Sequence, residues 1–122
     1  MSETIQSLMT RNLLDVFGGR DPAPRRAAVD ALYAEGAVFG DHGRIHSGRD
    51  GIDAAAAAVQ AATPGFVFAA AGEVQTVGNA QDGAGRLNWT YGPAEDPHRV
   101  TGTDFALVRD GKIRELYVFL DG

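Results

Sequence analysis

Two carboxylates stand beside apolar residues, where they would be costly to bury. Asp41 comes just after the apolar run AVF, residues 37–39, and Asp104 lies in the middle of TGTDFALV between apolar neighbours. Asp is a poor strand residue and is rarely buried without a partner. If the fold brings both into one apolar cavity, they cannot both ionise cheaply, so one tends to stay neutral and the other ionised. Such a pair suits proton abstraction beside a carbonyl or acid-base ring chemistry.

Some of these residues also have a plainer interpretation. Asp41 could end a strand as a turn residue whose carboxylate binds nearby backbone N–H groups. Asp104 is harder to explain in this way, because it is expected in mid-strand among apolar residues. Tyr33 and Trp89 could be core aromatics whose polar atoms find partners.

A metal site is not expected. Asp41, His42 and His46 lie close in the sequence, but strand alternation would send Asp41 and His42 to opposite faces, and no H-E-x-x-H spacing is present. The absence of Cys excludes disulfides, thiolate metal sites and Cys nucleophiles. The glycines fall in turns and form no phosphate-binding loop, so no cofactor is expected.

Composition and charge narrow the class of partner. The formal net charge is -5 and the 11 Lys and Arg residues are scattered, which argues against a nucleic-acid-binding surface. The segment MSETIQSLMTRN has no apolar core typical of a signal peptide, and no apolar run has the length of a membrane span. We therefore expect a cytoplasmic protein whose partner is neither nucleic acid nor a membrane.

The pattern of residues predicts three helices and then an antiparallel meander. Helical spacing of apolar residues indicates helices over 5–17, 24–35 and 51–63, with a short strand over 37–41. Four further strands are separated by turn clusters and cover 66–79, 85–92, 98–111 and 112–122. This order is typical of an α+β fold with helices on one face of a sheet, and we expect one domain over 1–122.

Beside this order of elements, the chain contains the motifs GTDFALVRDGKI, LYVFLD and WTYGP. In these features the sequence resembles the SnoaL-like, or ketosteroid-isomerase-like, group of the nuclear transport factor 2-like superfamily. It implies a cone-shaped barrel, nuclear transport factor 2-like or cystatin-like, in which three N-terminal helices pack in a strongly curved mixed or antiparallel sheet around one apolar cavity. It also implies a homodimer through the outer face of the sheet, and LYVFL is apolar on both faces, as such a strand would be.

The resemblance assigns roles to four residues. Asp41 matches the general base of ketosteroid isomerases, and Asp104 matches the protonated carboxyl that donates a hydrogen bond to the forming oxyanion. Tyr33 matches a second-helix tyrosine that supports this network. Asp121 matches an acid-base Asp of the cyclases, although a solvated chain end is the alternative for this residue. The residues expected to contact the ligand are Phe39, Trp89, Val100, Leu116 and Val118.

Three functions remain open at this stage. The first is an isomerase, cyclase or lyase that acts by acid-base catalysis on a small, mostly apolar carbonyl or cyclic compound. The second is a non-catalytic ligand-binding or dimerisation module. It is favoured because the first-helix tyrosine of the isomerases is absent: the matching positions are Leu13, Leu14 or Phe17. The third is an epoxide hydrolase, which would need Arg86 or Arg99 to point inward between two carboxylates.

Overall fold

The helices of this protein form where the apolar periodicity predicts them, with shifted ends. The computed structural model describes residues 4–121, and the predicted ends of the domain at 1–3 and 122 lie outside them. The Thr4 side chain caps the first helix by accepting a hydrogen bond from the Ser7 N–H at 3.1 Å. The helical segments are α1 (Ile5–Arg11), η1 (Asn12–Phe17), α2 (Pro22–Leu32) and α3 (Gly48–Ala62).

Two helix predictions need correction. The segment over 5–17 is not one α-helix, because η1 is a π-helix whose wider turn is closed by the Gly18 N–H bonding the Leu13 carbonyl at 2.9 Å. The second helix ends at Leu32, because Tyr33 already has extended backbone and begins the first strand. Helical periodicity cannot distinguish an α-turn from a π-turn, nor a helix end from an inward-facing first strand residue.

The strands form one mixed sheet. They are β1 (Tyr33–Gly40), β2 (Ile45–Ser47), β3 (Val67–Ala70), β4 (Gln75–Gly78), β5 (Gly83–Gly92), β6 (Val100–Arg109) and β7 (Lys112–Leu120). Their order is β2-β1-β7-β6-β5-β3, with β4 also pairing with β5. Among the strand pairs of residues 4–121, only β1 and β7 run parallel. The single strand predicted over 66–79 is two strands, because the chain leaves the sheet at Gly72, where φ is +110°.

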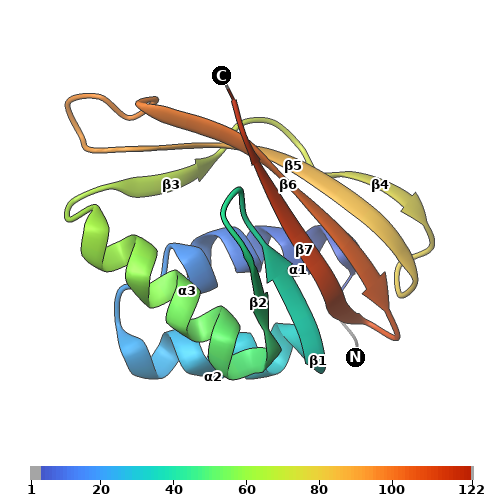
Figure 1. Cartoon of the computed structure of the whole chain (residues 1–122). Helices are drawn as coiled ribbons and strands as arrows, with labels where there is room; N and C mark the ends of the chain where they lie inside the picture. The colour runs from blue at the N-terminus through green and yellow to red at the C-terminus, as the bar shows by residue number, and fades with distance from the viewer. Residues whose placement is uncertain (1–3, 122) are drawn as a thin grey trace.

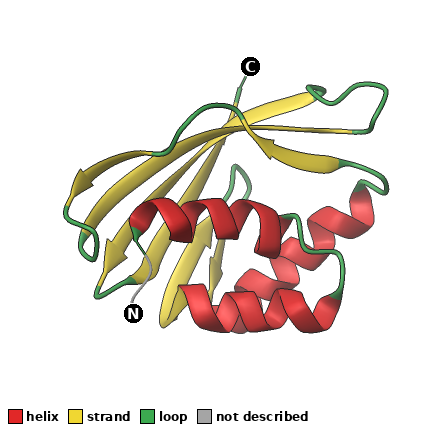
Figure 2. Cartoon of the chain, turned by 180° about the vertical axis from the view of Figure 1, so that it is seen from behind, coloured by secondary structure: helices red, strands yellow, loops and turns green. Residues whose placement is uncertain are grey.

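The sheet curves over three helices, which are α1 with η1, α2 and α3, and they lie against one of its faces (Figure 1, and from behind Figure 2). Register shifts interrupt the β1–β7 and β6–β7 ladders, and such irregularities bend and twist a sheet. The sheet does not close, since β2 and β3 end its order. The predicted α+β fold, with three N-terminal helices packed in a strongly curved mixed sheet, is confirmed.

Two glycines allow side chains to approach the sheet closely. A Cβ at Gly85 would lie 2.4 Å from the Met9 sulfur and 2.7 Å from Ile5 Cγ2, so its absence lets α1 pack directly on β5. A Cβ at Gly102 would lie 2.5 Å from the indole of Trp89, its cross-strand partner. Gly102 therefore leaves room for Trp89 to lie across β6 towards Asp104.

Apolar side chains remain exposed on the last strand. Phe119 is 60% exposed and Leu120 is 50% exposed, in agreement with the expectation that LYVFL is apolar on both faces.

The homodimer and the cytoplasmic location stay predictions. Among the helices of residues 4–121, none has both the length and the apolar character to cross a membrane.

Candidate active site

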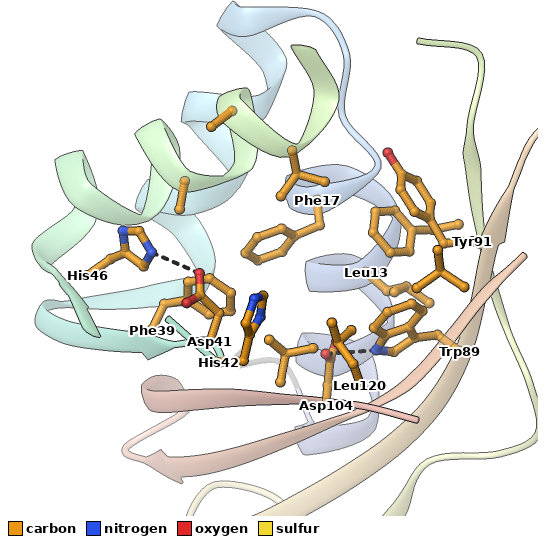
Figure 3. Close-up of a pocket in the computed structure, with 16 residues that line it drawn as sticks. Leu13, Phe17, Phe39, Asp41, His42, His46, Trp89, Tyr91, Asp104 and Leu120 are labelled. Atoms are coloured by element: carbon orange, nitrogen blue, oxygen red, sulfur yellow. Dashed lines mark hydrogen bonds and ion pairs between the residues drawn. The ribbon is translucent and has the colours of Figure 1, made fainter. Parts of the chain in front are cut away.

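A cavity of about 330 Å³ lies between the helices and the sheet (Figure 3). Its wall is mostly apolar and rich in aromatic rings from η1, β1, β3 and β5. This volume and this lining are typical of small-molecule sites. Four of the five expected ligand contacts, Phe39, Trp89, Val100 and Val118, line it.

Leu116, the fifth expected ligand contact, does not line the cavity. Its side chain is fully buried, and it belongs to the core rather than to the cavity wall. On β7 the neighbouring inward residue, Val118, takes that place. Strand parity identifies the face of the sheet on which a residue lies, but not how far along the cone the cavity extends.

Asp104 provides a buried acid in the cavity wall. It lies in the middle of β6, is 6% exposed, and its Oδ1 accepts a hydrogen bond from Trp89 Nε1–H at 3.0 Å. Its Oδ2 has no hydrogen-bond partner among residues 4–121. Burial raises the pKa of Asp104 to about 7, and the hydrogen bond from Trp89 limits the rise. Asp104 can therefore hold a proton close to neutral pH.

Tyr33 lies behind the cavity and does not line it. It is fully buried at the start of β1, and its hydroxyl donates a hydrogen bond to Asn12 Oδ1. Burial and then the negative charge of Asp104 raise the pKa of Tyr33 well above its ordinary value. Tyr33 thus forms part of the polar surroundings of Asp104. Asn12 on η1, which no sequence pattern singles out, holds it in place.

At the cavity mouth lie Asp41, His42 and His46, which we call the mouth cluster (Figure 3). Asp41 is a turn residue, as its plainer interpretation predicts, since its Oδ1 accepts hydrogen bonds from the Gly43 N–H at 2.8 Å and the Arg44 N–H at 3.0 Å. Its Oδ2 lies 3.1 Å from His46 Nε2. Asp41 therefore belongs both to the turn after β1 and to the cavity.

The electrostatics of Asp41 and Asp104 are opposite. Partial burial acts to raise the pKa of Asp41, but hydrogen bonds from the Gly43 N–H, from His46 and from the Arg44 N–H outweigh it and leave that pKa below its usual value. The ring of His46 stacks on Phe39 with 5.5 Å between centroids, which fixes its position beside Asp41. One carboxyl of the cavity is thus held ionised and the other is disposed to stay neutral.

His42 is a cavity residue that sequence reasoning missed. The alternation rule placed it on the face opposite Asp41, yet both side chains line the cavity (Figure 3). The rule fails because β1 ends at Gly40, so the two residues belong to a turn. Within residues 4–121, no three His, Cys, Asp or Glu side chains are placed to hold a metal ion.

Three other candidate residues lie away from the cavity. Asp121 is exposed, and its Oδ2 accepts a hydrogen bond from the Thr101 hydroxyl at 2.7 Å. Arg86 is exposed and binds the side chain of Gln75. Arg99 pairs with Asp96 at 3.0 Å. None of the three lines the cavity, so the Asp-Arg-Asp arrangement of an epoxide hydrolase is absent from the described site.

Comparison with known proteins agrees with this architecture. The sequence profile of the SnoaL-like domain matches residues 10–116. The chain belongs to the SnoaL-like family. No curated protein sequence matches this SnoaL-like chain.

Solved structures extend the comparison. A candidate isomerase of the SnoaL-like family from Agrobacterium tumefaciens is 25% identical, with a TM-score of 0.83 and 97% of each chain covered. A nuclear transport factor 2-like protein of unknown function from Mesorhizobium loti is 30% identical, with a TM-score of 0.68 over 95% of this chain and 89% of that one. A candidate SnoaL-like polyketide cyclase from Jannaschia sp. CCS1 is 15% identical, with a TM-score of 0.73 over 94% and 83% of the two chains, and shows the fold alone.

Proposed function

We propose that this SnoaL-like protein catalyses proton transfer on a small, mostly apolar carbonyl or cyclic compound, in the manner of an isomerase or cyclase. The observation that carries the proposal is the placement of Asp104, a buried carboxyl with a free oxygen, in the wall of an apolar cavity whose mouth holds ionisable groups. The SnoaL-like family and the isomerase name of the neighbour from Agrobacterium tumefaciens support the same class of reaction.

In this proposal Asp104 is the acid. Protonated Asp104 donates a hydrogen bond through Oδ2 to the carbonyl oxygen of a substrate, and this bond strengthens when the oxygen gains negative charge. Trp89 holds Oδ1 and so directs the other oxygen into the cavity. The base belongs to the mouth cluster, which lines the same cavity as this acid. The surrounding apolar wall excludes water and favours neutral, flat compounds.

The test uses 2-tetralone, a small bicyclic ketone, as the probe. Exchange of its α-protons for deuterium in D₂O at pH 6.5 is followed by proton NMR. Asp104→Ala should lower the protein-dependent exchange rate about 100-fold, because one donor to the developing oxyanion is lost. Asp30→Ala is the matched control, since Asp30 is an exposed carboxylate on α2 that pairs with Arg26. Equal rates in wild type and Asp104→Ala would contradict the proposal.

A further inference from the structure

We propose that His42 is the general base of this site and that Asp41 is a positioning residue, an assignment that rests on the proposed proton-transfer function. The family resemblance would give the base role to Asp41. The contacts of the mouth cluster favour the neighbouring imidazole instead.

Both oxygens of Asp41 already have partners. Oδ1 accepts two backbone N–H groups of its own turn, and Oδ2 lies 3.1 Å from His46 Nε2. A carboxylate stabilised in this way is a weak base, and its depressed pKa agrees with that. Taking a substrate proton would cost it the bond to His46 or loosen the turn.

His46 is engaged as well. With Asp41 ionised, the contact requires a proton on His46 Nε2, so this nitrogen is a donor and not an acceptor. Figure 3 shows that Nε2 is the ring nitrogen directed at Asp41, on the cavity side of the imidazole. His46 is therefore suited to holding Asp41 rather than to receiving a proton from the cavity.

His42 has neither restriction. Its side chain lines the cavity (Figure 3), and within residues 4–121 its imidazole has no hydrogen-bond or ion-pair partner. The residue is also exposed, so its ring is open to the cavity on one side and to water on the other. A general base needs this combination, because it must reach the substrate proton and then exchange that proton with solvent.

The proton transfer balances with these two residues. The His42 imidazole takes a proton from the carbon next to the carbonyl, and the electron pair of that C–H bond moves to form an enolate. The enolate oxygen accepts the hydrogen bond from protonated Asp104. Return of a proton or deuteron from the imidazolium to carbon restores the ketone and the neutral imidazole.

The pH dependence separates the two possible bases. Imidazoles change charge between about pH 5 and 8, whereas a carboxylate with a depressed pKa is ionised throughout that range. A rate that depends on an imidazole base should therefore rise from pH 5 towards neutrality and fall again as Asp104 ionises. A rate that depends on Asp41, whose pKa lies below its usual value, should be flat on the acid side. Besides His42, the titratable groups that line this cavity are Asp41, His46, Tyr91 and Asp104, and Tyr117 lines a neighbouring groove that His42 also borders.

The experiment measures 2-tetralone exchange from pH 5 to pH 8 with four variants. His42→Gln should slow the protein-dependent rate about 100-fold and remove the rise on the acid side. His98→Gln, a substitution of an exposed histidine outside the cavity, should stay within about threefold of wild type. His46→Gln keeps an N–H donor for Asp41, so it should lose less of the rate than His42→Gln and should keep the rise on the acid side. Added imidazole should restore part of the rate to His42→Ala, because the vacated site is open to solvent.

The outcomes are distinguishable from a failure of the proposed function. If Asp104→Ala loses the exchange while His42→Gln keeps the wild-type rate and profile, the function stands and the assignment of His42 is wrong. The assignment of His42 would also be wrong if His42→Gln lost the exchange but added imidazole restored no rate to His42→Ala. It would be wrong as well if His46→Gln lost as much of the exchange rate as His42→Gln. If wild type is no faster than Asp104→Ala, both the function and the inference fail.

Discussion

Asp104→Asn should stabilise the protein relative to wild type by about 2.5 kcal/mol more at pH 8 than at pH 5. The pKa of Asp104 is about 7 in the folded protein and about 3.9 for an unfolded Asp. A raised pKa means that the folded state binds the proton more tightly. The stability from this group is present in full below the unfolded pKa and is lost as pH rises through the folded one. The free energy of unfolding of wild type therefore falls between pH 5 and pH 8. The amide side chain in Asp104→Asn does not ionise, so the variant does not lose this stability.

Asn is a close match to the carboxyl it replaces. Its side-chain oxygen can still accept the hydrogen bond from Trp89 Nε1, and its volume is nearly unchanged. Urea unfolding of both proteins at the two pH values gives the difference, with Asp30→Asn, an exposed carboxylate paired with Arg26, as the control. A stability difference that stays constant with pH, or a variant that is weaker at pH 8 than at pH 5 relative to wild type, would show that Asp104 is held ionised.

Ala58→Trp should weaken binding of a neutral apolar ligand at least about tenfold, which is 1.4 kcal/mol. Ala58 lines the cavity from α3 and is itself exposed, so a larger side chain can enter the cavity from its rim without displacing the core. An indole occupies much of the space that a ligand would use. Titration with N-phenyl-1-naphthylamine, whose fluorescence increases in apolar surroundings, measures the affinity.

The matched control is Ala54→Trp. Ala54 lies one turn earlier on α3, is also exposed and does not line the cavity. Ala54→Trp should bind the dye with the affinity of wild type. Both Trp variants should melt within a few degrees of wild type. Equal dye affinity in Ala58→Trp and wild type would show that the ligand does not occupy this cavity.

Much of the fold could be predicted from sequence because the relevant signals are local. Apolar residues at helical spacing marked the helices, and turn residues such as Asp110-Gly111 marked the ends of the last strands. The break at Gly72 between β3 and β4 could not be predicted, since a glycine inside an apolar run is compatible with a continuous strand. The parallel pairing of β1 with β7 depends on contacts between strands that lie far apart in the sequence, and no local pattern encodes it.

The site was predictable only in part, for a related reason. Asp104 could be singled out because a charged residue amid apolar strand residues needs an explanation, and Asp41 because it follows an apolar run. The inward position of His42 depends on the turn geometry after Gly40, which the alternation rule does not describe. The contacts of Asp41 with His46 and of Tyr33 with Asn12 join residues through turns and separate elements, which spacing alone does not reveal.

Whether the apolar cavity contains an acid that stays protonated near neutral pH is best tested by titrating Asp104 directly. Wild-type protein labelled with ¹³C at the Asp side-chain carboxyls is followed by NMR from pH 4 to pH 9, and the Asp104 signal is identified by its absence in Asp104→Asn. Its chemical shift should change with a midpoint of about 7. A midpoint at or below about 4 for Asp104 would show that it is ionised at neutral pH, and would contradict its role as the acid of this site.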